Sequence, residues 1–260
     1  MRPGDILLVC LIGLTLTGLG LDAVSNGALG AWLPAHLPAI GARTGQALGW
    51  IGWAVSPLIL VPLVSAVLGS VVGTPNWLAA GLRRGALAID AVSTTVADAV
   101  RWAALALVLI TALIVVQRYV FGISITKLQE SVIYLHSLLF LLTSAAALLT
   151  GGHVRVDIIY SKLSEKGRAW TDLAGIYLAL IPMSWLILET SRSYVGGAWR
   201  ILERSRETDG LPLVFLLKTA IPVFAIMMIL QGLSMAARAA LTVSNRTAPP
   251  VGVDAGEHEL

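Results

Sequence analysis

The chain has 260 residues, of which 57% are hydrophobic and 13% charged, and its formal net charge is +3. So few polar residues cannot cover a soluble particle of 27.4 kDa, and the mean hydropathy of +0.82 agrees. The composition therefore predicts an all-α integral membrane protein. The basic residues are spread over many short connections, which argues against a nucleic-acid partner and favours contact with phospholipid headgroups. Because Cys10 is the single cysteine, an internal disulfide and a thiolate-based metal centre are excluded.

Several stretches approach the roughly 20 apolar residues that a helix needs to cross a bilayer. In chain order they are residues 6–21, 48–72, 100–121, 129–150, 170–193 and 212–237. The first two are expected to form a transmembrane hairpin within residues 1–75. A loop rich in Gly, Pro and Ala is predicted to join them, and it contains Trp32, His36 and Arg43. The other four predict a helical core over residues 100–240, followed by a polar tail, 241–260.

The first apolar stretch also has the length of a secretory signal peptide and follows Met1 and Arg2. No small-residue cleavage motif follows it closely, and its removal would leave the second stretch without a hairpin partner. We therefore expect the stretch to be retained.

Residues 76–99 show the periodicity of an amphipathic helix. Its expected apolar face consists of Leu78, Leu82, Ile89, Val92, Val96 and Val100. The opposite face carries Arg83, Arg84, Asp90, Thr94 and Asp98. Two placements fit this pattern, a helix lying in the membrane interface or a helix packed on a partner subunit.

The distribution of Lys and Arg predicts the orientation of the spans. With a cytoplasmic N-terminus, ten basic residues fall on the cytoplasmic side, namely Arg2, Arg83, Arg84, Arg101, Arg155, Lys162, Lys166, Arg168, Arg238 and Arg246. Eight fall on the other side, namely Arg43, Arg118, Lys127, Arg192, Arg200, Arg204, Arg206 and Lys218. The balance favours cytoplasmic placement of both termini.

The connection "GGHVRVDIIYSKLSEKGRAW" after the fourth span combines His153 and Asp157 at a helical spacing of four. Two such ligands without a third make a poor metal site. The preferred interpretation is a cytoplasmic hinge. In it, Gly151 and Gly152 end one helix, Arg155 meets phosphates of the headgroups, and Ser164 and Glu165 begin the next helix. Asp157 would pair locally or cap a turn.

The motifs of a phosphate-binding loop, a zinc protease and a serine hydrolase are absent from the sequence. A haem or quinone anchor of a redox complex is the alternative class, because such subunits are also small helical bundles with histidine ligands. His136 and His153 lie about 25 Å apart along one expected helix, too far to hold the same iron. We therefore expect His136 to form a hydrogen bond between helices.

Other polar residues lie close to the ends of the expected spans. Arg118 and Glu130 flank the tight connection between the third and fourth spans and could form an ion pair across it. Thr143, Ala147 and Gly151 form a stripe of small residues at steps of four, which would let another helix approach closely.

Three ordered blocks then resemble a known family: "QRYVFG" from residue 117, "GGHVRVDIIYSKLSEKGRAWTDL" from 151 and "GLPLVFLLKTAIP" from 210. They are similar to the small, DctQ-like membrane subunit of tripartite ATP-independent periplasmic (TRAP) transporters, with most likeness to the mannitol/chloroaromatic subgroup. The likeness covers about residues 98–240. It departs at "KLQE", where the family commonly has Trp followed by two acidic residues and this chain keeps only Glu130. The motif residues of these blocks, together with Glu130 of "KLQE", are Gln117, Arg118, Glu130, Gly152, His153, Arg155, Asp157, Gly210, Pro212 and Lys218.

The resemblance implies a non-catalytic subunit that binds a large, DctM-like permease in a bacterial inner membrane. In such a system a periplasmic binding protein delivers an organic anion, a carboxylate or sulfonate, which the large subunit imports with sodium. Sodium and substrate sites are expected in that subunit, so no cofactor or metal is expected here. The N-terminal hairpin is additional to the family's four helices.

Overall fold

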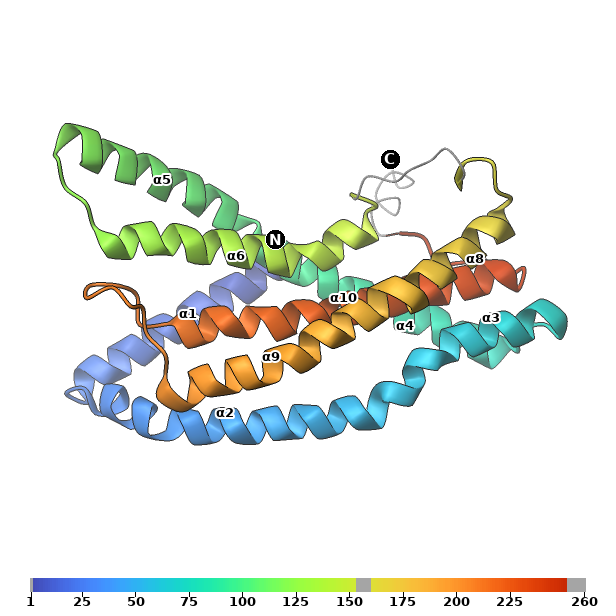
Figure 1. The fold of residues 1–260 in the computed structure, drawn as a ribbon, viewed down its shortest axis with the longest axis horizontal. Coiled ribbons are helices and arrows are strands. Elements are labelled where there is room, and N and C mark those ends of the chain that lie inside the picture. Colours follow the sequence, from blue (N-terminus) through green and yellow to red (C-terminus); the bar gives the residue numbers. More distant parts are fainter. Residues whose placement is uncertain (1, 153–159, 252–260) are drawn as a thin grey trace. The chain divides into compact units, whose positions relative to one another are not determined.

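The computed structural model describes residues 2–152 and 160–251, and all regular structure within them is helical (Figure 1). The N-terminal part contains α1 (Pro3–Val24), α2 (Ala28–Val55), a 3-10 helix (Ser56–Leu60) and α3 (Val61–Val71). The rest contains α4 (Asn76–Val100), α5 (Trp102–Val120), α6 (Thr126–Leu149), α8 (Glu165–Gly175), a π-helical turn (Ile176–Leu180), α9 (Ile181–Ile201) and α10 (Val214–Val243).

In the described part of the chain, 5 helical stretches are long and apolar enough to cross a membrane. They are Pro3–Val24, Asn76–Val120, Thr126–Leu149, Glu165–Ile201 and Val214–Val243. The four expected core spans overlap the last four of them, with ends that agree to within two residues where a span extends past its helix. This confirms the predicted all-α membrane class.

The N-terminal region differs from the expected hairpin. The segment predicted as a loop is helical, because α2 runs from Ala28 to Val55 with Pro34 and Pro38 inside it. The expected second span, 48–72, is instead divided among the end of α2, a 3-10 helix and α3, which begins with Pro62 in its first turn. Pro34 and Pro38 each lack the backbone donor of an ordinary residue, yet neither ends the helix, so the Gly and Pro content of this segment did not predict its structure.

The predicted helix over 76–99 is confirmed as α4, but its buried face differs from the predicted apolar face. The buried positions are mostly small residues: Ala79, Leu82, Ala86, Asp90, Ser93 and Ala99. Val92, placed on the apolar face by periodicity, is exposed. Small side chains allow close helix packing, and Asp90 and Ser93 are buried because α10 supplies hydrogen-bond partners.

The chain forms two compact units, each built from three stretches of sequence. Unit 1 comprises the described residues of Met1–Trp50, Thr95–Thr143 and Glu189–Val223. Unit 2 comprises those of Ile51–Thr94, Ser144–Leu188 and Phe224–Leu260. Unit 2 has a core of buried apolar residues from α3, α4, α8 and α10, including Ala66, Leu82, Leu173, Ala236 and Leu241.

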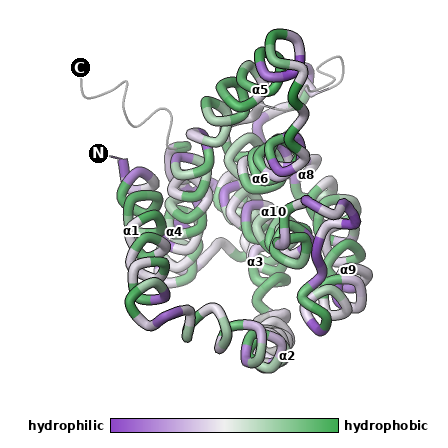
Figure 2. Tube along the Cα trace, turned by 90° about the vertical axis from the view of Figure 1, so that its left-hand side faces the viewer, coloured by the Kyte–Doolittle hydropathy of each residue, from purple (hydrophilic) through white to green (hydrophobic). Residues whose placement is uncertain are grey.

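In unit 1 the start of α1 packs on the end of α4. Gly4 is the buried residue of α1, and a Cβ there would overlap the α4 backbone. Two ion pairs flank the contact, Arg2 with Asp98 at 3.0 Å and Arg101 with Asp5 at 2.6 Å. By contrast, α5 contains no buried residue, and hydrophobic residues follow its length (Figure 2).

The helix ends around the predicted hinge follow ordinary capping rules. Gly151 has a φ of +67°, and the amides of Gly151 and Gly152 donate to the carbonyls of Leu148 and Ala147. This is a Schellman motif, so the expected stop of the fourth span is confirmed. Ser164 accepts a hydrogen bond from the Gly167 amide at the start of α8, as predicted for an N-cap. His153, Arg155 and Asp157 lie outside the described residues.

Candidate functional site: polar contacts between core helices

Glu130, near the start of α6, anchors the connection between α9 and α10 within unit 1. Its Oε1 accepts a hydrogen bond from Ser205 Oγ, and its Oε2 accepts one from the Leu211 amide at 2.5 Å. The Ser205 amide donates to the Leu211 carbonyl at 3.1 Å, which closes the connection on itself. One carboxylate therefore satisfies two donors from a segment about 80 residues away in sequence.

Gly210 is required by this closure. A Cβ at Gly210 would overlap the Ser205 side chain and lie 2.9 Å from Glu130 Oε1. Pro212 follows within the short bend that precedes α10. Two residues of the third resemblance block thus lie at the Glu130 anchor, although sequence reasoning did not link them to Glu130.

Lys218 joins the first turns of α10 to the end of α9. Its Nζ lies 2.6 Å from Glu203 Oε2 and 3.9 Å from the centre of the Tyr194 ring. The ammonium is therefore paired both with a carboxylate and with an aromatic face. A more exposed pair, Lys127 with Asp209 at 2.6 Å, connects the start of α6 to the same connection.

The predicted ion pair between Arg118 and Glu130 is not formed. Arg118 is exposed at the end of α5, while both oxygens of Glu130 accept from the α9–α10 connection. Gln117 acts through its backbone, because its carbonyl accepts from the Phe121 and Ile123 amides and so ends α5. Closeness in sequence suggested the pair, but the face of α6 that carries Glu130 is turned to a more distant segment.

A second polar cluster, in unit 2, joins α4 to α10. Asp90 pairs with Arg238, and their side chains are only 8% and 13% exposed. Asp90 Oδ1 also accepts from Ser234 Oγ at 2.7 Å and Gln231 Nε2 at 3.1 Å. Ser93 Oγ donates to Gln231 Oε1 at 2.7 Å. Every member thus has a partner, which is the condition for stable burial of polar groups.

Sequence reasoning missed this cluster, although a signal was present. Gln231, Ser234 and Arg238 recur at steps of three and four on one face of α10. A polar stripe along an apolar helix predicts a polar partner within the protein. The count of basic residues places Arg238 on the cytoplasmic side and gives it no partner. Arg238 also donates to the carbonyls of Pro249 and Pro250 at 3.2 and 3.3 Å.

The small-residue stripe is only partly continuous. Thr143 and Ala147 are half-buried on α6, whereas Gly151 lies beyond the end of the helix. The residues of α6 that are buried within the chain are Ala145 and Leu149. Close packing of Thr143 and Ala147 against another subunit stays a prediction.

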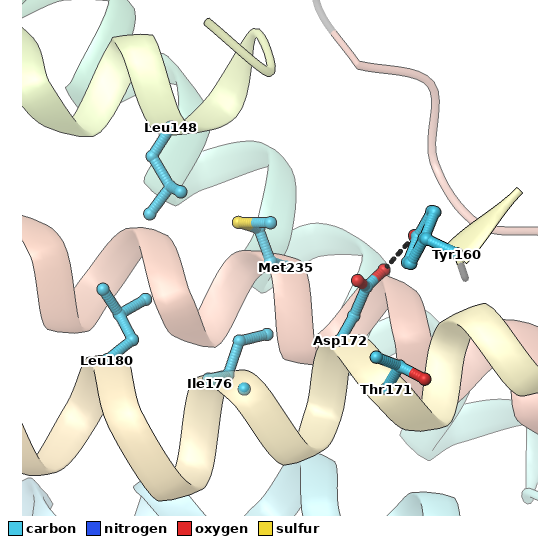
Figure 3. Close-up of a pocket in the computed structure, with 8 residues that line it drawn as sticks. Leu148, Tyr160, Thr171, Asp172, Ile176, Leu180 and Met235 are labelled. Atoms are coloured by element: carbon cyan, nitrogen blue, oxygen red, sulfur yellow. Dashed lines mark hydrogen bonds between the residues drawn. The ribbon is translucent and has the colours of Figure 1, made fainter. Parts of the chain in front are cut away.

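A cavity of about 370 Å³ in unit 2 is mainly apolar and lined by Leu148, Tyr160, Thr171, Asp172, Gly175, Ile176, Leu180 and Met235. At one end the Tyr160 hydroxyl donates to Asp172 Oδ2 at 2.9 Å (Figure 3). Asp172 is the one charged residue among the described residues of the lining. Within residues 2–152 and 160–251, no group of three or more His, Cys, Asp or Glu could hold a metal ion.

Together, these features define a polytopic α-helical membrane protein whose polar side chains mainly fasten helices and connections to one another. The sequence pattern of the family described as "Tripartite ATP-independent periplasmic transporters, DctQ component" matches residues 107–242. The chain therefore belongs to this family and is a small membrane subunit of a TRAP transporter. Searches of curated proteins and of solved structures found no match.

Proposed function

We propose that this chain is a non-catalytic scaffold for the large, DctM-like permease of its transporter. In this proposal the large subunit carries the sodium and substrate sites and imports an organic anion of the carboxylate or sulfonate class. A periplasmic binding protein delivers the anion, and the complex lies in the bacterial inner membrane. The family membership supports the transporter role.

The observation that carries the scaffold role is the exposed surface of α5 and α6. The 19 residues of α5 include none that is buried. On α6, Ile133, His136 and Phe140 share an exposed face. The expected bond from His136 to another helix is not found among the described residues. A polar ring on an apolar helix surface is unfavourable in lipid, so we infer that the large subunit covers His136.

The α9–α10 connection is the part that we propose to face the binding protein. It is held by Glu130, Lys127 and Lys218, so its conformation is set before any partner arrives. A preformed surface loses less conformational entropy on binding than a mobile one. The alternative function, a haem or quinone anchor, receives no support, because His36 stacks on Trp32 and contacts its carbonyl with Nδ1, while His136 is exposed.

The proposal is tested by reconstitution into liposomes. This chain alone should show no sodium-dependent uptake of any carboxylate or sulfonate, whereas uptake should appear when the large subunit and loaded binding protein are added. The large subunit without this chain should be unstable or inactive, because it would lose the helix surface that it buries against the scaffold.

A matched pair of variants tests the proposed contact. His136→Leu should reduce co-purification with the large subunit, while Trp185→Leu, which alters an exposed residue on α9, outside the proposed surface of α5 and α6, should not. Solute flux through the chain alone would disprove the scaffold role. Full activity of the large subunit without the chain would reduce it to an accessory.

A further inference from the structure

The start of α4 carries a group of arginines that the contacts described above do not use. A cavity of about 340 Å³ lies there in unit 2, lined by Asn76, Ala79, Ala80, Arg83, Arg84 and Arg246. Three of these lining residues are cations and none is an acid. We call Arg83, Arg84 and Arg246 the arginine pocket. All three lie outside the segment 107–242 that matches the family.

The fold brings these residues together from distant parts of the sequence. The end of α10 lies against the start of α4, where Thr74 Oγ1 donates to Ser244 Oγ at 2.8 Å. One nitrogen of Arg246, Nη2, donates to the Thr74 carbonyl at 2.8 Å. These bonds hold Arg246 beside the first turns of α4, which carry Arg83 and Arg84. The positive end of the α4 helix dipole adds to the positive electrostatic potential of the pocket.

The charge of the pocket is not neutralised within the described part of the chain. The sequence contains no Asp or Glu between Asp22 and Asp90. Among residues 2–152 and 160–251, the ion pairs of the structure include none of the three arginines. The Nε of Arg83 is buried and has no hydrogen-bond partner among the described residues. A buried donor of this kind is stabilised when an acceptor reaches it.

The surroundings of the pocket indicate where that acceptor comes from. Val71, Val72 and Trp77 lie in the adjoining end of α3 and start of α4, and they are 84%, 83% and 74% exposed. Exposed valine beside tryptophan is typical of a surface that enters the membrane interface, at the depth of the headgroups. A soluble anion would require no such apolar border.

We propose that the arginine pocket binds the phosphate of an anionic phospholipid headgroup. Guanidinium groups form charge-assisted, often bidentate hydrogen bonds with phosphate oxygens, and three of them can surround one phosphate. The bound lipid would fix the α3–α4 turn at the membrane surface. This role is separate from the scaffold contacts of α5 and α6.

The test uses the full chain purified in detergent and titrated with phosphatidylglycerol, with bound lipid counted by native mass spectrometry. Each Arg→Gln substitution in the pocket should weaken binding about fivefold, and the triple variant about 100-fold. The control replaces Arg43, Arg204 and Arg206, which are exposed elsewhere, and removes the same charge. This control should bind like the wild type. Arg84→Gln alone, at an exposed position, keeps the test valid if the triple variant misfolds.

Two further arms separate the lipid from other acceptors. Inorganic phosphate or glycerophosphate at millimolar concentration should not displace the lipid, because neither has acyl chains to enter the membrane interface. A chain ending at Val251, without the acidic residues Asp254, Glu257 and Glu259, should bind the lipid with unchanged affinity. Displacement by inorganic phosphate, tighter binding by the shortened chain, or equal losses in the control would each overturn the proposal.

Discussion

At the scale of single residues, the structure contains two kinds of ion pair, one buried within the chain and one exposed on its surface. Asp90 and Arg238 are almost fully buried and share Gln231 and Ser234 as further partners. Arg2 and Asp98 form an ion pair on the surface at 3.0 Å, in which the Arg2 side chain is 66% exposed. Removal of one partner costs more stability in the buried pair than in the exposed pair, because the remaining buried charge cannot be hydrated.

Asp90→Asn should therefore destabilise the protein by about 3 kcal/mol, since it leaves the Arg238 guanidinium buried without a counter-charge. Arg2→Gln, the matched removal of one charge from an exposed pair, should change stability by less than about 1 kcal/mol. Reversible unfolding in mixed micelles, titrated with sodium dodecyl sulfate, measures both. Similar effects of the two substitutions would show that the Asp90 cluster is hydrated in the native protein.

At the scale of helices, the end of α6 depends on backbone geometry rather than on the packing stripe expected from spacing. Gly151 adopts a φ of +67°, which an L-residue adopts only with strain. Gly175 has ordinary helical angles, with a φ of −60°, and a Cβ there would meet nothing within 4 Å. Two glycines in the same unit are thus expected to respond in opposite ways to the same substitution.

Gly151→Ala should destabilise the protein by about 1 kcal/mol, because the helix end must keep its left-handed residue. Gly175→Ala should instead stabilise it by up to about 1 kcal/mol, because alanine has the higher helix propensity. The same unfolding titration compares them. A loss of stability at Gly175 equal to that at Gly151 would contradict the assigned geometry.

At the scale of the whole molecule, the path from α1 back to α4 decides the number of membrane crossings. Within residues 2–152 and 160–251, 5 helical stretches have a length and composition suited to crossing a membrane, and the α2–α3 segment is not among them. Both termini can be cytoplasmic, as the basic residues predict, only if this segment also crosses. The apolar 3-10 helix and α3, Ser56–Val71, would have to combine with the end of α2 to do so.

Single cysteines in a Cys10→Ala background test this topology with an impermeant thiol reagent. Positions Asn26 and Thr208 should react in intact cells, and Ser161 should be shielded. We choose Thr208 because Ser205 is engaged by Glu130. Reaction at Thr208 with protection at Asn26 would mean that the α2–α3 segment stays on one side and that the termini lie on opposite sides.

The sequence alone was sufficient to predict the class of protein, the four helices of the core and the family. These depend on local properties: a bilayer requires long apolar helices, and Gly151, Gly152 and Ser164 set helix ends through their own backbones or side chains. The site was harder to predict. Glu130 and Gly210 are both motif residues, yet nothing in the sequence around either of them shows that they lie together.

Only the tertiary structure decided which polar groups meet and which face of α4 is buried. Periodicity placed Asp90 on a polar face, but burial depends on what packs opposite, and α10 supplies Arg238, Ser234 and Gln231 there. Likewise, α2 continues through Pro34 and Pro38, which local rules treat as helix breakers. The physical reason is common to these cases: a hydrogen bond or a close contact between distant segments depends on the path of the whole chain, which no local pattern records.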